Sequence, residues 1–236
     1  GIILPDGVQS IADMAFFNCA ALKYVDTTLD VITTIGNHAF YNCTSLKSIE
    51  LPNSLTSFGT SVFYGSGLES ITIPASVTTI SNQLFRNAKS LKSVTMSDDV
   101  TSIGDQVFNS CVALESIKLP SSLTSLGANA FNGCSALKSV EVPEGVTKLN
   151  NYTFQNCTSL ESVKLPEGLT SMGTYVFKGC SALKSVEIPE GVTSIGNYSF
   201  QNCSALETVN LPTGLKTLGT YMFDGCSMLK SIAVPE

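Results

Sequence analysis

Apolar residues recur along the chain in a short fixed pattern, L-[KE]-S-[VI]-x-[LIV], in which the first, fourth and sixth positions are apolar and the others mostly polar. A short apolar run with this alternation predicts a strand whose first, fourth and sixth side chains face inward. Because the pattern returns at a nearly constant spacing of 24, 22 and then 23 residues seven times, it predicts a stack of repeated coils. The copies begin at Leu22, Leu46, Leu68, Leu91, Leu114, Leu137, Leu160, Leu183, Leu206 and Leu229.

Two further columns of the repeat mark where its elements end. All nine prolines follow the apolar run, and since proline lacks an N–H and fixes φ, this column marks the end of each strand. A Gly follows the next Ile or Leu in most coils, with Ser81 and Asn150 as exceptions, and it predicts a tight turn into a short helical or 3₁₀ segment. The prolines are Pro5, Pro52, Pro74, Pro120, Pro143, Pro166, Pro189, Pro212 and Pro235.

One Phe per coil occupies a single column, which predicts a continuous aromatic spine through the core. One repeat buries too few apolar side chains to fold alone, so stacking on its neighbours must supply the rest. The sequence therefore predicts a solenoid of about ten coils in one domain over residues 1–236, with both ends cut in mid-repeat and a parallel sheet roughly 45 Å long. The spine residues are Phe16, Phe40, Phe63, Phe85, Phe108, Phe131, Phe154, Phe177, Phe200 and Phe223.

The stretch LKSVEIPEGVTSIGNYSFQNCSALETVNLP resembles the BspA-like group of leucine-rich repeats, and the similarity covers nearly the whole chain. The resemblance implies an α/β repeat solenoid: a right-handed superhelix with a parallel strand sheet on its concave face and short helical, 3₁₀ or irregular segments on its convex face. It also implies a surface protein that binds host or bacterial proteins, in some members extracellular-matrix components. Gly214 stands where the general leucine-rich pattern has Asn or Cys, so we expect the usual asparagine ladder to be missing.

Charges on the strand face alternate in sign along the stack. The second position of the pattern alternates Lys and Glu from Lys47 to Lys230, and the fifth position joins it over part of the array. Identical charges stacked in register would repel at every step, whereas alternation makes each contact attractive. Exposed pairs contribute only about 0.2 to 1 kcal/mol each, so the favoured role is register and solubility, with binding second. The residues retained as binding candidates are Glu161, Lys164, Lys184 and Glu187.

Tyrosines occupy the column two residues before the spine Phe in four successive C-terminal coils. An exposed column would form a tyrosine stripe suited to a protein interface, because Tyr is enriched at interfaces. The alternative is a partly buried ladder of rings that pack on one another. The four candidates are Tyr152, Tyr175, Tyr198 and Tyr221.

All eight cysteines share one repeat position, which Ser66 and Ala88 fill in the two remaining coils. A disulfide framework would not place every cysteine at one phase of the repeat, and a free Cys behaves as a small buried hydrophobe. Packing is therefore the favoured interpretation, with coupled pairs or a metal as alternatives. The column comprises Cys19, Cys43, Cys111, Cys134, Cys157, Cys180, Cys203 and Cys226.

Composition narrows the possible functions. A net charge of −6 and a pI near 4.8 argue against nucleic-acid or anionic-membrane partners, which need a basic footprint. No apolar run approaches the length of a membrane span. His38 is the only histidine and falls in the tyrosine column, so a solvated or capping role is favoured over catalysis, and the chain has no paired metal-ligand spacing.

These observations predict a non-enzymatic protein-binding or adhesion module, extracellular or on a cell surface, without a cofactor, metal or membrane insertion. The expected partner is a protein, either a host extracellular-matrix component or a bacterial surface protein. The alternative is a structural spacer or stalk that has no ligand of its own.

Overall fold

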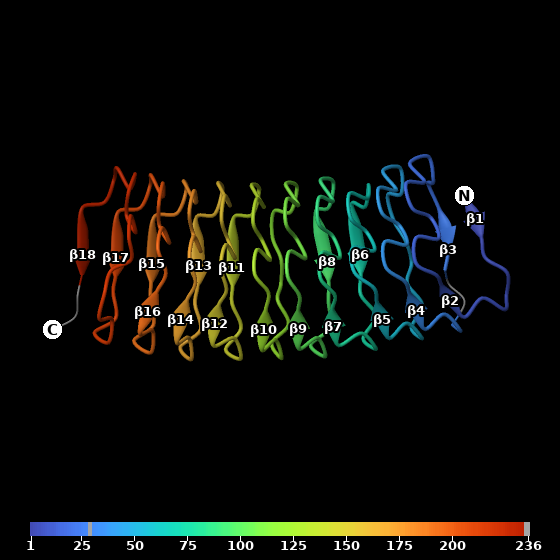
Figure 1. Cartoon of the computed structure of the whole chain (residues 1–236), viewed down its shortest axis with the longest axis horizontal. Coiled ribbons are helices and arrows are strands. Elements are labelled where there is room, and N and C mark those ends of the chain that lie inside the picture. The colour runs from blue at the N-terminus through green and yellow to red at the C-terminus, as the bar shows by residue number, and fades with distance from the viewer. Residues whose placement is uncertain (28–29, 234–236) are drawn as a thin grey trace.

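The computed structural model shows a single row of stacked coils, most of which contribute short parallel strands to two rows (Figure 1). It describes residues 1–27 and 30–233 of the 236. Strands of the first row occupy the third to fifth positions of the apolar pattern, as predicted. This row consists of β1 (Ile2–Ile3), β3 (Val25–Asp26), β6 (Ser70–Thr72), β8 (Ser93–Thr95), β11 (Ser139–Glu141), β13 (Ser162–Lys164), β15 (Ser185–Glu187), β17 (Thr208–Asn210) and β18 (Ser231–Ala233).

The second row lies between the proline and the glycine columns, where the sequence analysis places only a turn. Each of its strands consists of a polar residue followed by the apolar residue that precedes the glycine position. The row consists of β2 (Ser10–Ile11), β4 (Thr34–Ile35), β5 (Ser57–Phe58), β7 (Thr79–Ile80), β9 (Ser102–Ile103), β10 (Ser125–Leu126), β12 (Lys148–Leu149), β14 (Ser171–Met172) and β16 (Ser194–Ile195).

Neighbouring strands pair in parallel one repeat apart, as where Ser185 faces Thr208 and Thr208 faces Ser231. The predicted solenoid is therefore confirmed, with turns in place of the helical segments, since the described residues contain no helix. The backbone explains this. Two positions of each turn have a left-handed conformation, as at Tyr198 (φ 60°) and Asn202 (φ 61°), and left-handed residues cannot continue a right-handed helix.

Neither row is one continuous sheet. The first row is divided into the groups β1–β3, β6–β8, β11–β13 and β15–β17–β18, and the second into three groups of three strands. In the first row, residues 48–50 form no strand, and Ser116 contributes only a single bridge to Ser139. The break at 48–50 lies beside the two coils of irregular length. The predicted sheet of about 45 Å is thus a series of shorter sheets. Thr28, which stands at the proline position of its coil, and Pro235, the last proline, lie outside the described residues.

The aromatic spine is confirmed along its whole length. Successive rings from Phe16 to Phe223 are stacked, with centroids 5.1 to 5.8 Å apart. From Phe40 to Phe200 the spine residues have no exposed surface. Because each ring packs between its two column mates, every coil completes the core of the next one.

The glycine column exists because the coils approach one another closely there. A Cβ added at Gly196 would lie 2.5 Å from the carbonyl carbon of Gly173 in the preceding coil. Ser81 and Asn150, which replace the glycine within the stack, instead bond to the preceding coil: the Ser81 hydroxyl donates to the Phe58 carbonyl at 2.6 Å, and the Asn150 amide donates to the Leu126 carbonyl at 2.7 Å.

A polar ladder runs through the position after this glycine column. Its side-chain oxygens accept the backbone N–H of the next coil at 2.7 to 2.9 Å. The sequence analysis expects no asparagine ladder at the Gly214 column and does not foresee this one, which occupies a different column. Its acceptors are Asp13, Asn37, Asn82, Asp105, Asn151 and Asn197.

Candidate functional site

The four predicted tyrosines form a ladder on the face made by the turns between the glycine and cysteine columns, which we call the turn face. Successive rings are stacked, with centroids 4.7 to 5.4 Å apart and planes within 14° of parallel. Tyr152, Tyr175 and Tyr198 are half-buried, and Tyr221 is 60% exposed. Within the described residues, none of the four hydroxyls has a hydrogen-bond partner. The rings therefore pack on one another, and their edges and hydroxyls remain available.

The backbone of this tyrosine ladder is strained. All four tyrosines have positive φ, between 51° and 62°. A left-handed conformation costs roughly 1 to 2 kcal/mol for a residue with a Cβ, and less for Asn, which holds the same position at Asn129. Each stacked aromatic pair returns about 0.5 to 1.5 kcal/mol. Burial of the half-buried rings adds to this return, and the same left-handed conformation occurs at this position in all the other coils.

Lys178 lies over the ladder. Its Nζ is 5.1 Å from the centroid of the Tyr175 ring, a cation–π geometry. Burial raises the pKa of the Tyr175 phenol, and the neighbouring tyrosines add to the effect. The Tyr175 phenol therefore stays neutral at physiological pH, with the positive charge of Lys178 beside it.

A second aromatic ladder, absent from the sequence analysis, occupies the N-terminal end of the turn face. It lies one residue after the spine Phe, with Phe17 and Tyr41 4.8 Å apart and Tyr41 and Tyr64 4.4 Å apart between ring centroids. The His38 ring, from the tyrosine-ladder column, lies 5.7 Å from that of Tyr41, so the two columns adjoin. Three aromatic residues at one repeat phase are the sequence signal that could have revealed it.

The charge alternation on the strand face produces ion pairs between coils, as predicted. Five Lys–Glu pairs have N–O distances of 2.5 to 3.6 Å, with Glu69 shared by two of them, and all nine side-chain ends are largely exposed. Of the four charged candidates, Lys164 pairs with Glu141 at 2.5 Å. Glu161, Lys184 and Glu187 form no ion pair with a described residue. They lie where β13 and β15 are not hydrogen-bonded to each other.

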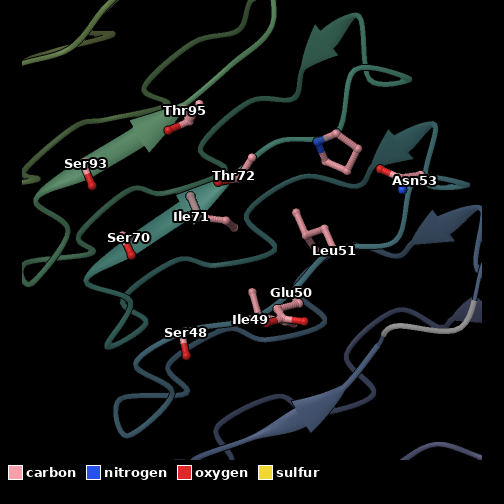
Figure 2. Close-up of a pocket in the computed structure, with 11 residues that line it drawn as sticks. Ser48, Ile49, Glu50, Leu51, Asn53, Ser70, Ile71, Thr72, Ser93 and Thr95 are labelled. Carbon is pink, nitrogen blue, oxygen red and sulfur yellow. The ribbon is translucent and has the colours of Figure 1, made fainter.

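The strand face also carries a shallow groove of about 500 Å³. Figure 2 shows Ser48, Ser70 and Ser93 in a row along it, with the hydroxyls of Thr72 and Thr95 further along their strands. Glu50 is its one charged residue, and none of its lining residues is aromatic. Most of the binding energy of a protein interface comes from a few residues, which are often aromatic or arginine. This groove has none of them, so we expect it to bind a partner weakly.

The cysteine column is a set of buried thiols, as the packing interpretation predicts. Six of the eight cysteines are buried, whereas Cys19 is exposed and Cys226 half-buried. Seven thiols, from Cys43 to Cys226, donate a hydrogen bond to the carbonyl of the spine Phe of the preceding coil, at 3.0 to 3.2 Å. Burial raises the pKa of Cys43 to about 11 and that of Cys157 to about 12, so these thiols are protonated and unreactive at neutral pH.

His38 and the possible metal-ligating residues are not arranged as in a catalytic site. His38 is half-buried at φ 56°, and its Nδ1 is buried without a hydrogen-bond partner. No group of three or more His, Cys, Asp or Glu residues in the described part of the chain is placed to hold a metal ion. Over the same residues there is no helix long and apolar enough to cross a membrane.

Stacked coils with parallel strands and an inward-facing Leu pattern define a leucine-rich-repeat solenoid. The family model of the BspA type leucine rich repeat region matches residues 9–138 and 124–236, in six copies. The chain belongs to this family.

Solved structures give the same fold. A leucine-rich repeat protein from Eubacterium ventriosum is 29% identical, with a TM-score of 0.66, over 98% of this chain and 64% of its own. A leucine-rich repeat protein from T. pallidum is 32% identical, with a TM-score of 0.53, over 77% of this chain and 76% of its own. Proteins with curated descriptions give no match.

Proposed function

We propose that this domain is a non-enzymatic protein-binding module of a secreted or cell-surface protein, and that the tyrosine ladder is part of its binding surface. The observation that carries the proposal is four stacked tyrosines held in left-handed backbone with unpartnered hydroxyls. The left-handed backbone is shared by this column in every coil, so the feature that distinguishes these four coils is the aromatic side chain with its hydroxyl. Tyr edges and hydroxyls also suit protein contacts, since they combine apolar area with hydrogen bonding.

The strand-face charges Glu161, Lys164, Lys184 and Glu187 form a second proposed contact region. Three of the four lack an ion pair with a described residue, so a partner could bind them without first breaking one. Exposed charges of this kind contribute mainly to association rate and specificity. The tyrosine ladder is therefore the region expected to supply most of the binding energy.

The cellular setting fits this proposal. A net charge of −6 disfavours nucleic acid and anionic lipid as partners. Outside the cell the environment is oxidising, and burial protects most of the thiols there. The family's leucine-rich repeats and the exposed edges of the tyrosine ladder both suit protein binding, with adhesion to a matrix or bacterial-surface protein as the specific role.

The test is an array of extracellular-matrix and bacterial-surface proteins probed with the domain and with the double variant Tyr175→Asn, Tyr198→Asn. Asn holds this column at Asn129, so the variant should fold. A matched control, Gln83→Asn with Gln106→Asn, makes the same change in the polar middle of the column.

The proposal expects saturable binding that the control retains and the tyrosine variant loses by tenfold or more. Unchanged binding by the tyrosine variant would remove the ladder from the interface. If the wild-type domain shows no saturable partner at all, it acts as a spacer instead.

A further inference from the structure

The N-terminal aromatic ladder, formed by Phe17, Tyr41 and Tyr64, ends in a cation. Arg86 occupies the next coil at the same column and is the only arginine of the chain. Its guanidinium carbon lies 5.7 Å from the centroid of the Tyr64 ring. Tyr41 and Tyr64 are half-buried, and Phe17 is 39% exposed. The patch thus combines aromatic edges with a positive charge.

The guanidinium of Arg86 has unused hydrogen-bonding capacity. Its Nε is buried and has no partner, and no carboxylate of the described residues forms an ion pair with it. Lys89, three residues further on, is exposed and likewise forms no ion pair there. Elsewhere, five lysines of the strand face pair with glutamates. Arg86 and Lys89, three residues apart in one coil, are therefore two cations without an ion pair to a described carboxylate.

A notch beside the ladder adds further polar groups. The coil is one residue short after Gly65, which leaves a recess of about 390 Å³ lined by residues including Thr44, Tyr64, Asn87 and Lys89. The Asn87 amide donates to the Tyr64 hydroxyl at 2.6 Å and fixes its position. None of the lining residues is acidic. The notch presents an ammonium group, a phenol and hydroxyls without any competing negative charge.

We propose that this patch, made of the N-terminal aromatic ladder, Arg86, Lys89 and the notch, docks an acidic segment of a protein partner. A carboxylate would take the two terminal guanidinium nitrogens of Arg86 in the bidentate geometry that arginine provides. An apolar side chain next to it would lie on the edges of Tyr41 and Phe17. The proposal gives the partner's chemistry for a second region of the proposed protein-binding function, on which it rests.

A protein segment fits this patch better than a nucleic acid. Single strands bind by stacking their bases on exposed ring faces, but here the rings cover one another and Arg86 covers the end of the ladder. The net charge of −6 would also repel a polyanion. One or two carboxylates flanked by apolar side chains match both the charge and the aromatic edges of the patch.

The test is a titration of the ¹⁵N-labelled domain with the peptide acetyl-Gly-Glu-Phe-Glu-Phe-Gly-amide, followed by amide chemical shifts. Its twin with Gln in place of Glu and sodium acetate are the comparison arms. The acidic peptide should shift the amides of Tyr41, Tyr64 and Asn87 saturably. It should bind at least fivefold more tightly than the Gln peptide, and its affinity should fall as salt rises. Acetate alone should bind more weakly still.

Variants separate Arg86 from general charge. Arg86→Gln should weaken the acidic peptide at least fivefold, and Arg86→Lys should weaken it by less because one charge remains. Lys178→Gln is the matched control, since it removes a cation over a tyrosine ring of the other ladder, and it should bind like the wild type.

Equal binding of both peptides, wild-type affinity in Arg86→Gln, shifts confined to the other ladder, or no shifts at all would overturn this assignment. The amide spectrum of each variant reports directly whether it is folded. Partner binding that is lost only in the Tyr175 and Tyr198 variant would leave the proposed function standing without this patch.

Discussion

Replacing Cys157 by serine should destabilise the domain more than replacing it by alanine, although serine is the closer match in shape. The Cys157 thiol is buried and donates to the Phe131 carbonyl at 3.1 Å. Ser66 shows what serine does at this position. Its hydroxyl is buried, at 3% exposure of the residue, yet has no hydrogen-bond partner. The shorter C–O bond does not bring the oxygen to the carbonyl that a thiol reaches.

The magnitudes follow from these contacts. Either substitution removes the buried sulfur and its weak hydrogen bond, which together contribute about 1 to 2 kcal/mol. Serine then adds the cost of a buried hydroxyl without a partner, about 1 to 3 kcal/mol. We therefore expect losses of about 1 to 2 kcal/mol for Cys157→Ala and about 2 to 5 kcal/mol for Cys157→Ser. By the same sum, the reverse change, Ser66→Cys, should stabilise the domain by about 2 to 5 kcal/mol.

Urea unfolding followed by circular dichroism measures the change in midpoint. Repeat arrays can unfold in parts, so hydrogen exchange of the Leu160 amide, which donates to the Cys157 carbonyl at 3.0 Å, supplies a local measure. The reasoning is refuted if Cys157→Ser is milder than Cys157→Ala, or if Ser66→Cys leaves the midpoint unchanged or lower.

Three further predictions concern the stack. Gly196→Ala should lower the free energy of unfolding by more than about 3 kcal/mol, because the new Cβ would lie 2.5 Å from backbone atoms of the preceding coil. Gly214→Ala, where no atom lies closer than 3.8 Å to the new Cβ, should change it by at most about 0.5 kcal/mol, and urea midpoints compare the two variants. Burial raises the pKa of the Cys157 thiol from 9.0 to about 12. The contribution of this thiol to the free energy of unfolding should therefore be constant below pH 9 and fall by up to about 1.4 kcal/mol per pH unit between pH 9 and pH 12. Urea unfolding at pH 7.5, 9 and 10.5 measures this fall. Lys138→Glu, which breaks an exposed pair with Glu115, should cost less than about 1 kcal/mol in the same assay, and a larger loss would contradict the weak-pair interpretation.

The repeat makes much of this fold predictable from sequence. A column of one residue type must stack on itself when coils are in register, so the Phe spine, the buried thiols and the ion pairs between coils all follow from alignment alone. Alignment alone does not decide between the two interpretations of the tyrosine column, an exposed stripe or a stacked ladder. Alignment places Tyr175 next to Tyr198, but whether their rings stack or point outward depends on φ, which is 60° at both residues.

The features that the sequence analysis missed depend on backbone geometry. Each strand of the second row is only two residues long, which is too short to give a periodic pattern in the sequence. These strands are defined by their hydrogen bonds to neighbouring coils. The helical turns were expected from a glycine that in fact permits close approach between coils. The break in the first row at Ser116, where a single bridge to Ser139 replaces a strand, lies among coils of regular length, so the repeat pattern does not predict it.

Two columns of the C-terminal half alternate between two residue types from coil to coil: the Lys–Glu column and the column of Gly133, Asn156, Gly179, Asn202 and Gly225. Gly179 follows Asn156 in its column because the Asn156 side-chain oxygen lies 2.6 Å from where a Cβ at Gly179 would stand. Both residue types also tolerate the left-handed backbone there, at φ 75° and 58°. The charged column alternates for the parallel reason that like charges repel. Column mates at these positions are therefore complementary rather than identical. The tyrosine ladder stacks like on like, as the Phe spine does, because aromatic rings, unlike equal charges, attract one another when they stack.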